Sequence, residues 1–532
     1  MILSKLINHS KTTTGIELQP IIPSAIKVAA VKKKKTAAAA TGTSLIMVRS
    51  FKSKQRVCFP LSHGHNTHTE LHSTMVSLSL LFHLLLLAFV DLSTSTTEYL
   101  KLPLLHKTPF PTPLQSLSSD LQRLSLLHHS HHRHQNHRRT SSKSPLMSGA
   151  SSGSGQYFVS IRLGSPPQTL LLVADTGSDL TWVRCSACKT NCSIHPPGST
   201  FLARHSTTFS PTHCFSSLCQ LVPQPNPNPC NHTRLHSTCR YEYVYSDGSK
   251  TSGFFSKETT TLNTSSGREM KLKSIAFGCG FHASGPSLIG SSFNGASGVM
   301  GLGRGPISFA SQLGRRFGRS FSYCLLDYTL SPPPTSYLMI GDVVSTKKDN
   351  KSMMSYTPLL INPEAPTFYY ISIKGVFVDG VKLHIDPSVW SLDELGNGGT
   401  VIDSGTTLTF LTEPAYREIL SAFKREVKLP SPTPGGASTQ SGFDLCVNVT
   451  GVSRPRFPRL SLELGGESLY SPPPRNYFID ISEGIKCLAI QPVEAESGRF
   501  SVIGNLMQQG FLLEFDRGKS RLGFSRRGCA VS

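Results

Sequence analysis

The chain has 532 residues, with 53 Lys and Arg against 32 Asp and Glu and a net charge of +21 at pH 7. Residues 1–150 hold 18 Lys and Arg and 5 Asp and Glu, so they carry +13 of this charge and leave +8 for the other 382 residues. The basic excess therefore belongs largely to a leader. It gives no support for nucleic-acid binding by the main body.

The first 96 residues divide at Met75. Residues 1–74 are rich in Lys, Thr and Ala and have no folding pattern, which predicts a disordered basic extension. After Met75 comes an apolar run over 76–90, followed by small polar residues. The run has the length of a signal-peptide core and is short for a membrane-spanning helix. We therefore expect a signal peptide over 75–96, and we interpret residues 1–74 as a gene-model artefact before the true start.

This leader predicts a secreted, extracellular protein without stable membrane insertion. Two alternatives stay open. The basic, acid-poor residues 1–74 also suit a transit peptide, which would direct the protein to an organelle. The apolar run also suits a membrane anchor.

Residues 97–150 are rich in Ser, Pro and His, with a histidine run from His128 to His134. A histidine run can bind metal, but its position between signal peptide and body favours a removable pro-segment. Its positive charge would cover an acidic cleft, and this charge grows as histidines protonate below a pKa of about 6.5.

The body that follows reads as a succession of short strands. Residues 156–163 alternate apolar and polar, residues 164–168 form a turn, and residues 169–174 are a continuous apolar strand suited to burial on both faces. The clearest helix spans 413–427, with Thr412 as its N-cap. Gly and Pro separate the many other short strands, so the pattern predicts an all-β protein.

Two similar phrases end buried strands in the two halves of the chain. Asp175-Thr-Gly-Ser closes the apolar run 170–174, and Asp403-Ser-Gly-Thr closes the apolar run 400–402. The two aspartates are 403 − 175 = 228 residues apart, which is about the length of one lobe. If the two halves face each other, both carboxylates meet at one point, and paired carboxylates are catalytic groups.

The surroundings of the two phrases repeat as well. An apolar-apolar-Gly phrase follows each aspartate, at 299–301 and at 502–504. This repetition predicts a duplicated lobe, with an N-terminal catalytic lobe over 151–345 and a C-terminal catalytic lobe over 346–532.

Residues 241–249 form a hairpin signal within the first lobe. An alternating strand ends at Tyr245 and runs into an Asp-Gly turn that contains Gly248. Alone, this pattern indicates an ordinary surface hairpin. Beside paired carboxylates it favours a mobile flap over a cleft.

The cysteines also concentrate in the body. Cys58 stands alone in the leader, and the other twelve lie between Cys185 and Cys529. An even number together with N-glycosylation sequons predicts six disulfides in a glycoprotein of an oxidising compartment. Zinc is the alternative for Cys185-x-x-Cys188, but no second ligand pair at zinc spacing accompanies it, so we expect no metal. The sequons begin at Asn191, Asn231, Asn263, Asn350 and Asn448.

Together these features resemble the pepsin-type aspartic peptidases of the plant nepenthesin-like branch, over about residues 155–532. The stretch 175–182 (Asp-Thr-Gly-Ser-Asp-Leu-Thr-Trp) matches the first family motif, and 402–408 (Ile-Asp-Ser-Gly-Thr-Thr-Leu) matches the second. No saposin-like insert interrupts the second lobe, unlike in typical plant vacuolar members. The resemblance implies an all-β, bilobal pepsin-like acid protease fold with the active-site cleft between two related lobes.

The resemblance also implies roles for individual residues. Asp175 and Asp403 are the catalytic pair. The residues that support them are Gly177, Ser178, Gly405 and Thr406. The substrate-binding residues are the flap residues Tyr245 and Gly248, together with Trp182. The implied disulfides are Cys185–Cys188, Cys192–Cys279, Cys214–Cys239, Cys219–Cys230, Cys324–Cys529 and Cys446–Cys487.

With the resemblance, these observations predict an aspartic endopeptidase secreted to the apoplast or cell wall, with the chloroplast or vacuole as the alternative location. It would work at acidic pH through a water activated by Asp175 and Asp403, without cofactor or metal. We expect a monomer with polypeptide substrates, inhibited by pepstatin-type compounds. Asn505 stands where some relatives have Asp, which predicts a shifted pH optimum. The alternative is a catalytically weak or inactive pepsin-fold protein that binds or inhibits glycosidases of the plant cell wall. Such relatives typically lose a catalytic aspartate, whereas both motifs here are complete, which favours the enzyme.

Overall fold

The computed structural model describes the chain from Tyr99 to Cys529 with gaps, and all of the described residues belong to one unit, Ser95–Ser532. The predicted basic extension and signal peptide lie outside the described residues, as do Tyr245 and Gly248 of the predicted flap. No helix among the described residues is both long and apolar enough to cross a membrane. The described residues are 99–105, 112–130, 156–187, 198–225, 228, 230, 237–244, 250–284, 295–327, 334–341, 354–432, 442–493, 500–526 and 529.

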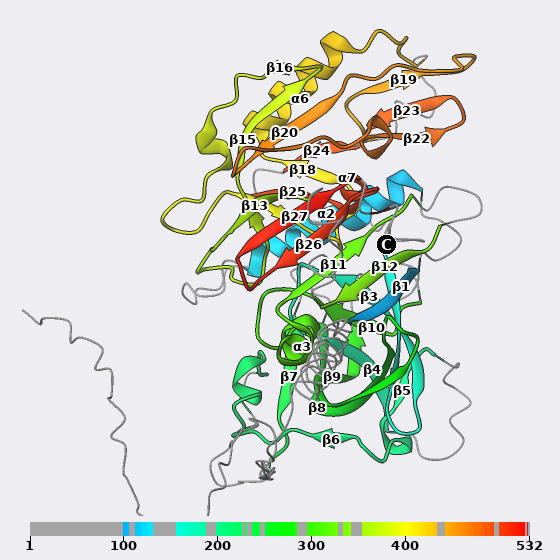
Figure 1. The fold of residues 1–532 in the computed structure, drawn as a ribbon, viewed down its shortest axis with the longest axis vertical. Coiled ribbons are helices and arrows are strands. Elements are labelled where there is room, and N and C mark those ends of the chain that lie inside the picture. The colour runs from blue at the N-terminus through cyan, green and yellow to red at the C-terminus, as the bar shows by residue number, and fades with distance from the viewer. Residues whose placement is uncertain are drawn as a thin grey trace, which may run out of the picture. The chain divides into compact units, whose positions relative to one another are not determined.

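Short strands dominate this part of the chain, and the all-β prediction is confirmed (Figure 1). The predicted strands at 156–163 and 169–174 are β2 and β3, which pair in antiparallel register. The first half contains β1 Leu100–Leu105, α2 Pro113–Ser130, β2 Phe158–Leu163, β3 Gln168–Asp175, β4 Trp182–Ser186, β5 Phe201–Leu202, β6 Ser210–Pro211, β7 Arg240–Val244, β8 Lys250–Asn263, β9 Glu269–Ser284, β10 Gly298–Gly301, α3 Phe309–Phe317, β11 Ser320–Cys324 and β12 Ser336–Ile340. The second half contains β13 Ser355–Leu360, β14 Tyr370–Ile371, β15 Ile373–Val378, β16 Val381–Lys382, β17 Thr400–Ile402, β18 Thr409–Leu411, α6 Glu413–Glu426, β19 Cys446–Asn448, β20 Leu460–Leu464, β21 Ser468–Tyr470, β22 Phe478–Ser482, β23 Ile485–Leu488, β24 Ile490–Pro492, β25 Ser501–Ile503, α7 Asn505–Gln508, β26 Leu512–Asp516 and β27 Arg521–Ser525. Short 3-10 helices cover Ala203–His205, Cys219–Leu221, Pro387–Trp390 and Pro474–Asn476.

One run of antiparallel strands joins the two halves, in the order β1-β12-β11-β26-β27-β13. β26 and β27 come from near the C-terminus, yet β26 pairs with β11 of the first half and sets Phe515 opposite Phe321. The two rings stack with centroids 4.7 Å apart. The halves therefore share backbone hydrogen bonds and one apolar core, which holds them in a defined relation to each other.

The edge strand of this run, β1, belongs to the segment interpreted above as a pro-segment. β1 lies beside β12, with which it pairs along its length (Figure 1). At its end it also pairs with β2. Leu100, Leu102 and Leu104 are buried, while the residues between them are partly or fully exposed. This period of two is that of a strand with one face on the core. The sequence reading did not predict this strand.

The predicted helix of the second half is α6, which ends one residue earlier than expected. Its apolar stripe packs in the core, where Phe423 contacts the rings of Tyr477 and Phe478. The prediction that the Thr412 side chain caps this helix is wrong, because Thr412 occupies the N-cap position without a side-chain cap hydrogen bond. Pro414 fills the second helical position and has no N–H, so one of the two usual donors to such a cap is missing.

The cysteine pairs of the first half differ from those that the resemblance implied. Cys185 is bonded to Cys279, because β4 and β9 are parallel neighbours that bring the two Cα atoms to 5.3 Å. This corrects the implied pairs Cys185–Cys188 and Cys192–Cys279. Cys188 and Cys192 themselves lie outside the described residues.

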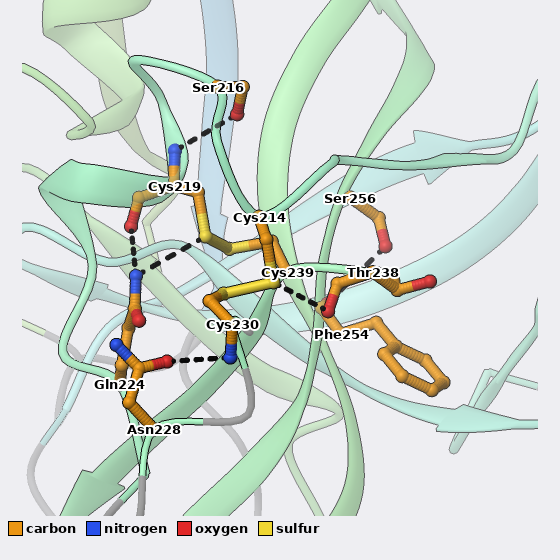
Figure 2. Close-up of a disulfide and its surroundings, with 10 residues drawn as sticks. All are labelled: Cys214, Ser216, Cys219, Gln224, Asn228, Cys230, Thr238, Cys239, Phe254 and Ser256. Carbon is orange, nitrogen blue, oxygen red and sulfur yellow. Dashed lines mark hydrogen bonds between the residues drawn. A yellow bond between two sulfur atoms is a disulfide. The ribbon is translucent and has the colours of Figure 1, made fainter. Parts of the chain in front are cut away.

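The implied pairs Cys214–Cys239 and Cys219–Cys230 are wrong as well. Figure 2 shows Cys214 bonded to Cys230 and Cys219 bonded to Cys239, with Cα separations of 5.4 and 5.8 Å. Cys219 and Cys239 are fully buried in the core cluster that also contains Tyr241, whereas Cys230 lies in a partly exposed loop. Cys214 is buried as well, but outside that cluster, so membership of the cluster separates an inner from an outer pair, which spacing alone does not reveal.

Two further disulfides among the described residues match the implied pairs. Cys324 in β11 is bonded to Cys529 near the C-terminus, and Cys446 is bonded to Cys487. The latter two residues lie directly opposite each other in the antiparallel pair β19 and β23.

Candidate active site

Asp175 lies at the end of β3, where a second strand runs beside it in the same direction. β10 is parallel to β3 and sets Gly301 opposite Asp175. The N–H of Leu302 donates to the carbonyl oxygen of Asp175 at 2.8 Å. The first apolar-apolar-Gly phrase therefore lies beside the first aspartate motif.

Asp403 has the same setting in the second half. β17 ends at Ile402, and β25 runs parallel to it with Ile503 opposite Ile402. The N–H of Asp403 donates to the carbonyl oxygen of Ile503 at 3.1 Å. Each motif thus has its own apolar-apolar-Gly phrase alongside, as a duplicated lobe predicts.

Glycine ends both of these phrases because neighbouring backbone leaves no room for a side chain. A Cβ atom on Gly301 would lie 2.4 Å from the carbonyl carbon of Asp179. A Cβ atom on Gly504 would lie 1.9 Å from the carbonyl oxygen of Leu408. Contacts under 3.0 Å are essentially never formed by real Cβ atoms, so any larger residue would displace the loop after the aspartate.

The carboxyl group of Asp175 is held at both oxygens by its own turn. The N–H of Gly177 donates to Oδ1 at 2.9 Å, and the hydroxyl of Ser178 donates to Oδ2 at 2.6 Å. Asp175 is 5% exposed, so water retains slight access to it. Gly177 and Ser178 therefore lie where the motif comparison implied.

The carboxyl group of Asp403 is held in the same way. Its Oδ1 accepts from the N–H of Gly405 at 3.1 Å, and its Oδ2 accepts from the hydroxyl of Thr406 at 2.6 Å. The two aspartates thus have matching hydrogen bonds, although they come from separate halves. Such bonds fix the plane of each carboxyl group.

The two turns are bonded directly to each other. The N–H of Ser404 donates to Thr176 Oγ1 at 2.9 Å, and the N–H of Thr176 donates to Ser404 Oγ at 3.2 Å. The Ser404 hydroxyl also donates to the carbonyl oxygen of Ala174 at 3.0 Å. All of these groups are buried, so the bonds fasten one aspartate turn to the other.

Two buried polar residues that the sequence reading did not assign support Asp403 from its backbone side. Gln508 donates through Nε2 to the carbonyl oxygens of Asp403 and Ile503, at 3.0 and 2.9 Å. The hydroxyl of Tyr323 donates to Gln508 Oε1 at 2.6 Å. Burial, and then the nearby Asp403, raise the pKa of Tyr323 well above its usual value, so the hydroxyl remains a donor. No sequence signal marks this contact, because it spans 185 residues.

Asp120 of α2 is a third acidic residue at this site, and the sequence reading missed it too. Its carboxyl group is buried and accepts from the backbone N–H of Thr407 at 2.8 Å and from that of Leu408. These residues directly follow the second motif. The available signal was composition, since Asp120 is the only acidic residue between Glu98 and Asp175.

Trp182 begins β4 and is buried in the same core cluster as Tyr241 of β7. β7 and β8 form the predicted antiparallel hairpin, with Val244 opposite Lys250. The tip of the hairpin, which carries Tyr245, lies outside the described residues. The flap role implied for these residues stays a prediction.

No group of three or more His, Cys, Asp or Glu side chains in the described ranges is arranged to hold a metal ion. The chemistry that the described site offers is that of two buried carboxyl groups supported by hydroxyl and backbone N–H donors.

Two family models match the chain, one in each half. The model described as Xylanase inhibitor N-terminal matches residues 157–342, and the model described as Xylanase inhibitor C-terminal matches residues 368–526. Among individual proteins, the chain is 37% identical to Aspartyl protease family protein 2 of Arabidopsis thaliana, over 73% of this chain and 74% of that one. It is 36% identical to aspartic proteinase nepenthesin-1 of Nepenthes gracilis, over 71% of this chain and 79% of that one.

Solved structures show the same fold at lower identity. The crystal structure of the protein named edgp superposes with a TM-score of 0.58 and 22% identity, covering 80% of this chain and 94% of that one. Basic 7S globulin from soybean superposes with a TM-score of 0.54 and 18% identity, covering 81% and 96%. From the two matched halves and the relatives at 36–37% identity, this chain belongs to the pepsin-like aspartic protease family, in the plant branch that includes the nepenthesins.

Proposed function

We propose that this protein is an aspartic endopeptidase that hydrolyses polypeptides at acidic pH. The main support is the matched pair of aspartate turns. Asp175 and Asp403 each accept from a glycine N–H and a hydroxyl, and Thr176 and Ser404 fasten the two turns together. An arrangement that serves only the fold has no need of two carboxyl groups with the same bonds in both halves.

The reaction follows from the electrostatics of such a pair. Two carboxylates that share one site cannot both ionise cheaply, so the pair keeps one proton through the acidic range. A water between Asp175 and Asp403 gives a proton to the ionised member as its oxygen attacks the peptide carbonyl carbon, and the protonated member donates to the carbonyl oxygen. When the resulting gem-diol collapses, one of its hydroxyl groups returns a proton to the pair, the C–N bond breaks and the amine leaves with a proton from the pair. Both proton transfers belong to the pair as a unit.

We further propose that residues 97–150 are a removable pro-segment. Its strand β1 lies in the sheet that joins the halves, and Asp120 of α2 accepts N–H bonds from Thr407 and Leu408 beside the second motif. A segment bonded so close to Asp403 is suited to keep the enzyme inactive until it is released. The disulfides of the body suit passage through an oxidising compartment and secretion.

The second candidate function is a pepsin-fold binding protein without catalysis. The description of both matching family models as xylanase inhibitor halves favours it. Against it stand both aspartates, each with its full set of donors. We therefore rank the peptidase first.

The two candidates separate in one assay. The purified protein, freed of residues 97–150 at acidic pH, is incubated with denatured globin at pH 3–5, with and without pepstatin. We expect pepstatin-sensitive cleavage that is lost in both Asp175→Asn and Asp403→Asn, with thermal unfolding of both variants close to that of the wild type. Absence of cleavage by the processed wild type, or full activity in either variant, refutes the proposed peptidase.

A further inference from the structure

Asp179 lies four residues after Asp175 and is not used by the proposed reaction. Its Oδ1 accepts from the N–H of Gly305 at 2.7 Å, and its Oδ2 accepts from the hydroxyl of Thr367 at 2.7 Å. Gly305 follows β10 in the first half, and Thr367 precedes β14 in the second half. One carboxyl group therefore joins three separate stretches of chain.

The segment after β10 closes tightly around this carboxyl group. A Cβ atom on Gly303 would lie 2.4 Å from Asp179 Oδ1, and a Cβ atom on Gly305 would lie 2.2 Å from Asp179 Oδ2. Neither position has room for a side chain while the carboxyl group is in place. Two glycines are therefore required to make room for the side chain of Asp179. An acidic residue without a structural role would not require them.

The same segment also reaches the first motif and the second half. The N–H of Leu302 donates to the carbonyl oxygen of Asp175 at 2.8 Å, and the hydroxyl of Tyr369 donates to the carbonyl oxygen of Leu302 at 2.8 Å. The N–H of Arg304 donates to the carbonyl oxygen of Thr367 at 3.0 Å. A displacement of this segment would therefore shift the backbone of Asp175.

We propose that Asp179 is a positioning residue of the aspartate pair. The carboxyl group of Asp179 fastens the loop after Asp175 to Thr367 of the second half. The alignment of the pair therefore depends on whether Asp179 is protonated. This inference rests on the proposed peptidase function for its kinetic consequences. Its consequence for stability is independent of catalysis.

The charged surroundings of Asp179 support the coupling. Burial of the carboxyl group raises the pKa of Asp179 above its usual value, the bonds from Thr367 and Gly305 oppose this, and the nearby Asp175 raises it further. Arg517 is the cation that acts against the rise. Two further titratable or charged groups, Tyr369 and Arg304, share this surrounding with Asp179 and Arg517.

The direction of the pH effect follows from linkage. A carboxyl group whose pKa is higher in the folded than in the unfolded protein contributes stability that is fully present below the unfolded value, about 3.9. This contribution is lost as the pH rises through the folded pKa, because the ionised group is poorly solvated. Asp179 thus favours the folded protein most at acidic pH, where the proposed enzyme works.

Asparagine at this position imitates the protonated acid. Its oxygen can accept from Gly305, and its amide can donate to Thr367 Oγ1, because a hydroxyl also accepts. We expect the melting temperature of Asp179→Asn to match that of the wild type at pH 3 and to rise above it as the pH increases to 7. Asp179→Ala, which keeps neither contact, should lower kcat by about 100-fold, and Asn should recover most of this loss.

Thr367 offers a second test in case Asp179→Ala does not fold. Thr367→Val keeps the shape and removes the donor, so kcat should fall roughly tenfold with KM nearly unchanged. Thr367→Ser keeps the donor and should recover most of that loss.

The outcomes separate this inference from the proposed function. If the wild type cleaves no globin, the peptidase proposal fails, and the melting temperatures of the Asp179 variants still decide whether the carboxyl group is a pH-dependent fastening. If the wild type cleaves globin, two results overturn the positioning role. One is a constant difference in melting temperature between Asp179→Asn and wild type from pH 3 to 7, and the other is equal kcat in Thr367→Val and Thr367→Ser.

Discussion

The hydroxyl of Thr176 donates to Asp403 Oδ1 at 3.2 Å, so the residue next to one motif aspartate holds the other aspartate. The same oxygen of Thr176 accepts the N–H of Ser404 at 2.9 Å. One side chain thus acts as donor and acceptor across the boundary between the halves, and all of these groups are buried. The alignment of the two carboxyl groups therefore depends on a contact that forms only when both halves are folded.

Replacing Thr176 with Val tests this dependence. Val has nearly the same shape, but it leaves the N–H of Ser404 and one oxygen of Asp403 without this partner. We expect the free energy of unfolding to fall by about 1–3 kcal/mol and kcat on a peptide substrate to fall tenfold or more. Urea unfolding and steady-state kinetics at pH 4 measure the two effects.

The matched control is Thr176→Ser, which keeps the hydroxyl and loses only a methyl group. It should retain most of the stability and of the kcat. A Thr176→Val protein whose kcat stays within twofold of the wild type contradicts the importance of this contact for alignment.

How far the sequence predicts this site depends on the range of the interactions. The turns after Asp175 and Asp403 are local, because a glycine and a hydroxyl within three residues supply the donors, and they are predictable from the motifs. The apolar-apolar-Gly phrases predicted a duplicated lobe, but they did not predict that β10 and β25 run parallel to the strands that end at the aspartates. The repetition of the aspartate motif in both halves predicted that the two aspartates form one catalytic site.

Contacts that depend on the assembled fold escaped prediction. The inner and outer pairs among Cys214, Cys219, Cys230 and Cys239 are decided by which cysteines the core buries, and spacing carries no such information. The bond between Asp120 and Thr407 spans 287 residues, and it starts from a segment whose composition indicated only a pro-segment. Long-range polar contacts leave no local pattern to read.

The substitution Asn505→Asp tests why this chain has Asn where some relatives have Asp. Asn505 is fully buried, and its Nδ2 donates to the carbonyl oxygen of Ser404 at 3.0 Å. A carboxylate cannot donate, so Asn505→Asp must stay protonated to keep this bond, and burial raises its pKa. We expect the variant to match the wild type in melting temperature near pH 3 and to lose stability as the pH rises through that raised pKa. Calorimetry between pH 3 and 7 measures the loss.

Asn505→Ala is the uncharged control, because it removes the same hydrogen bond without adding a titrating group. Its loss of stability should be about 1–3 kcal/mol and nearly independent of pH. If Asn505→Asp and Asn505→Ala lose stability in parallel across the pH range, the amide donor is not what this position requires.

Asp120 makes the proposed pro-segment testable with a built-in control. Its carboxyl group accepts from the backbone N–H groups of Thr407 and Leu408, and bonds to a charged group contribute about 1.5–3 kcal/mol each. Asp120→Ala should therefore loosen α2 beside Asp403. We expect faster amide hydrogen exchange at Thr407 and Leu408, and a shorter delay before globin cleavage begins when the unprocessed protein is shifted to pH 4.

Once residues 97–150 have been removed, the Asp120→Ala and wild-type proteins have the same sequence, so their kcat and KM must agree. That agreement separates a role in restraint from a role in folding of the body. An unprocessed Asp120→Ala protein with wild-type exchange at Thr407 and Leu408 and an unchanged delay argues against the anchor. The pro-segment would then be held by β1 and the apolar side of α2, where Leu117 and Leu124 are buried.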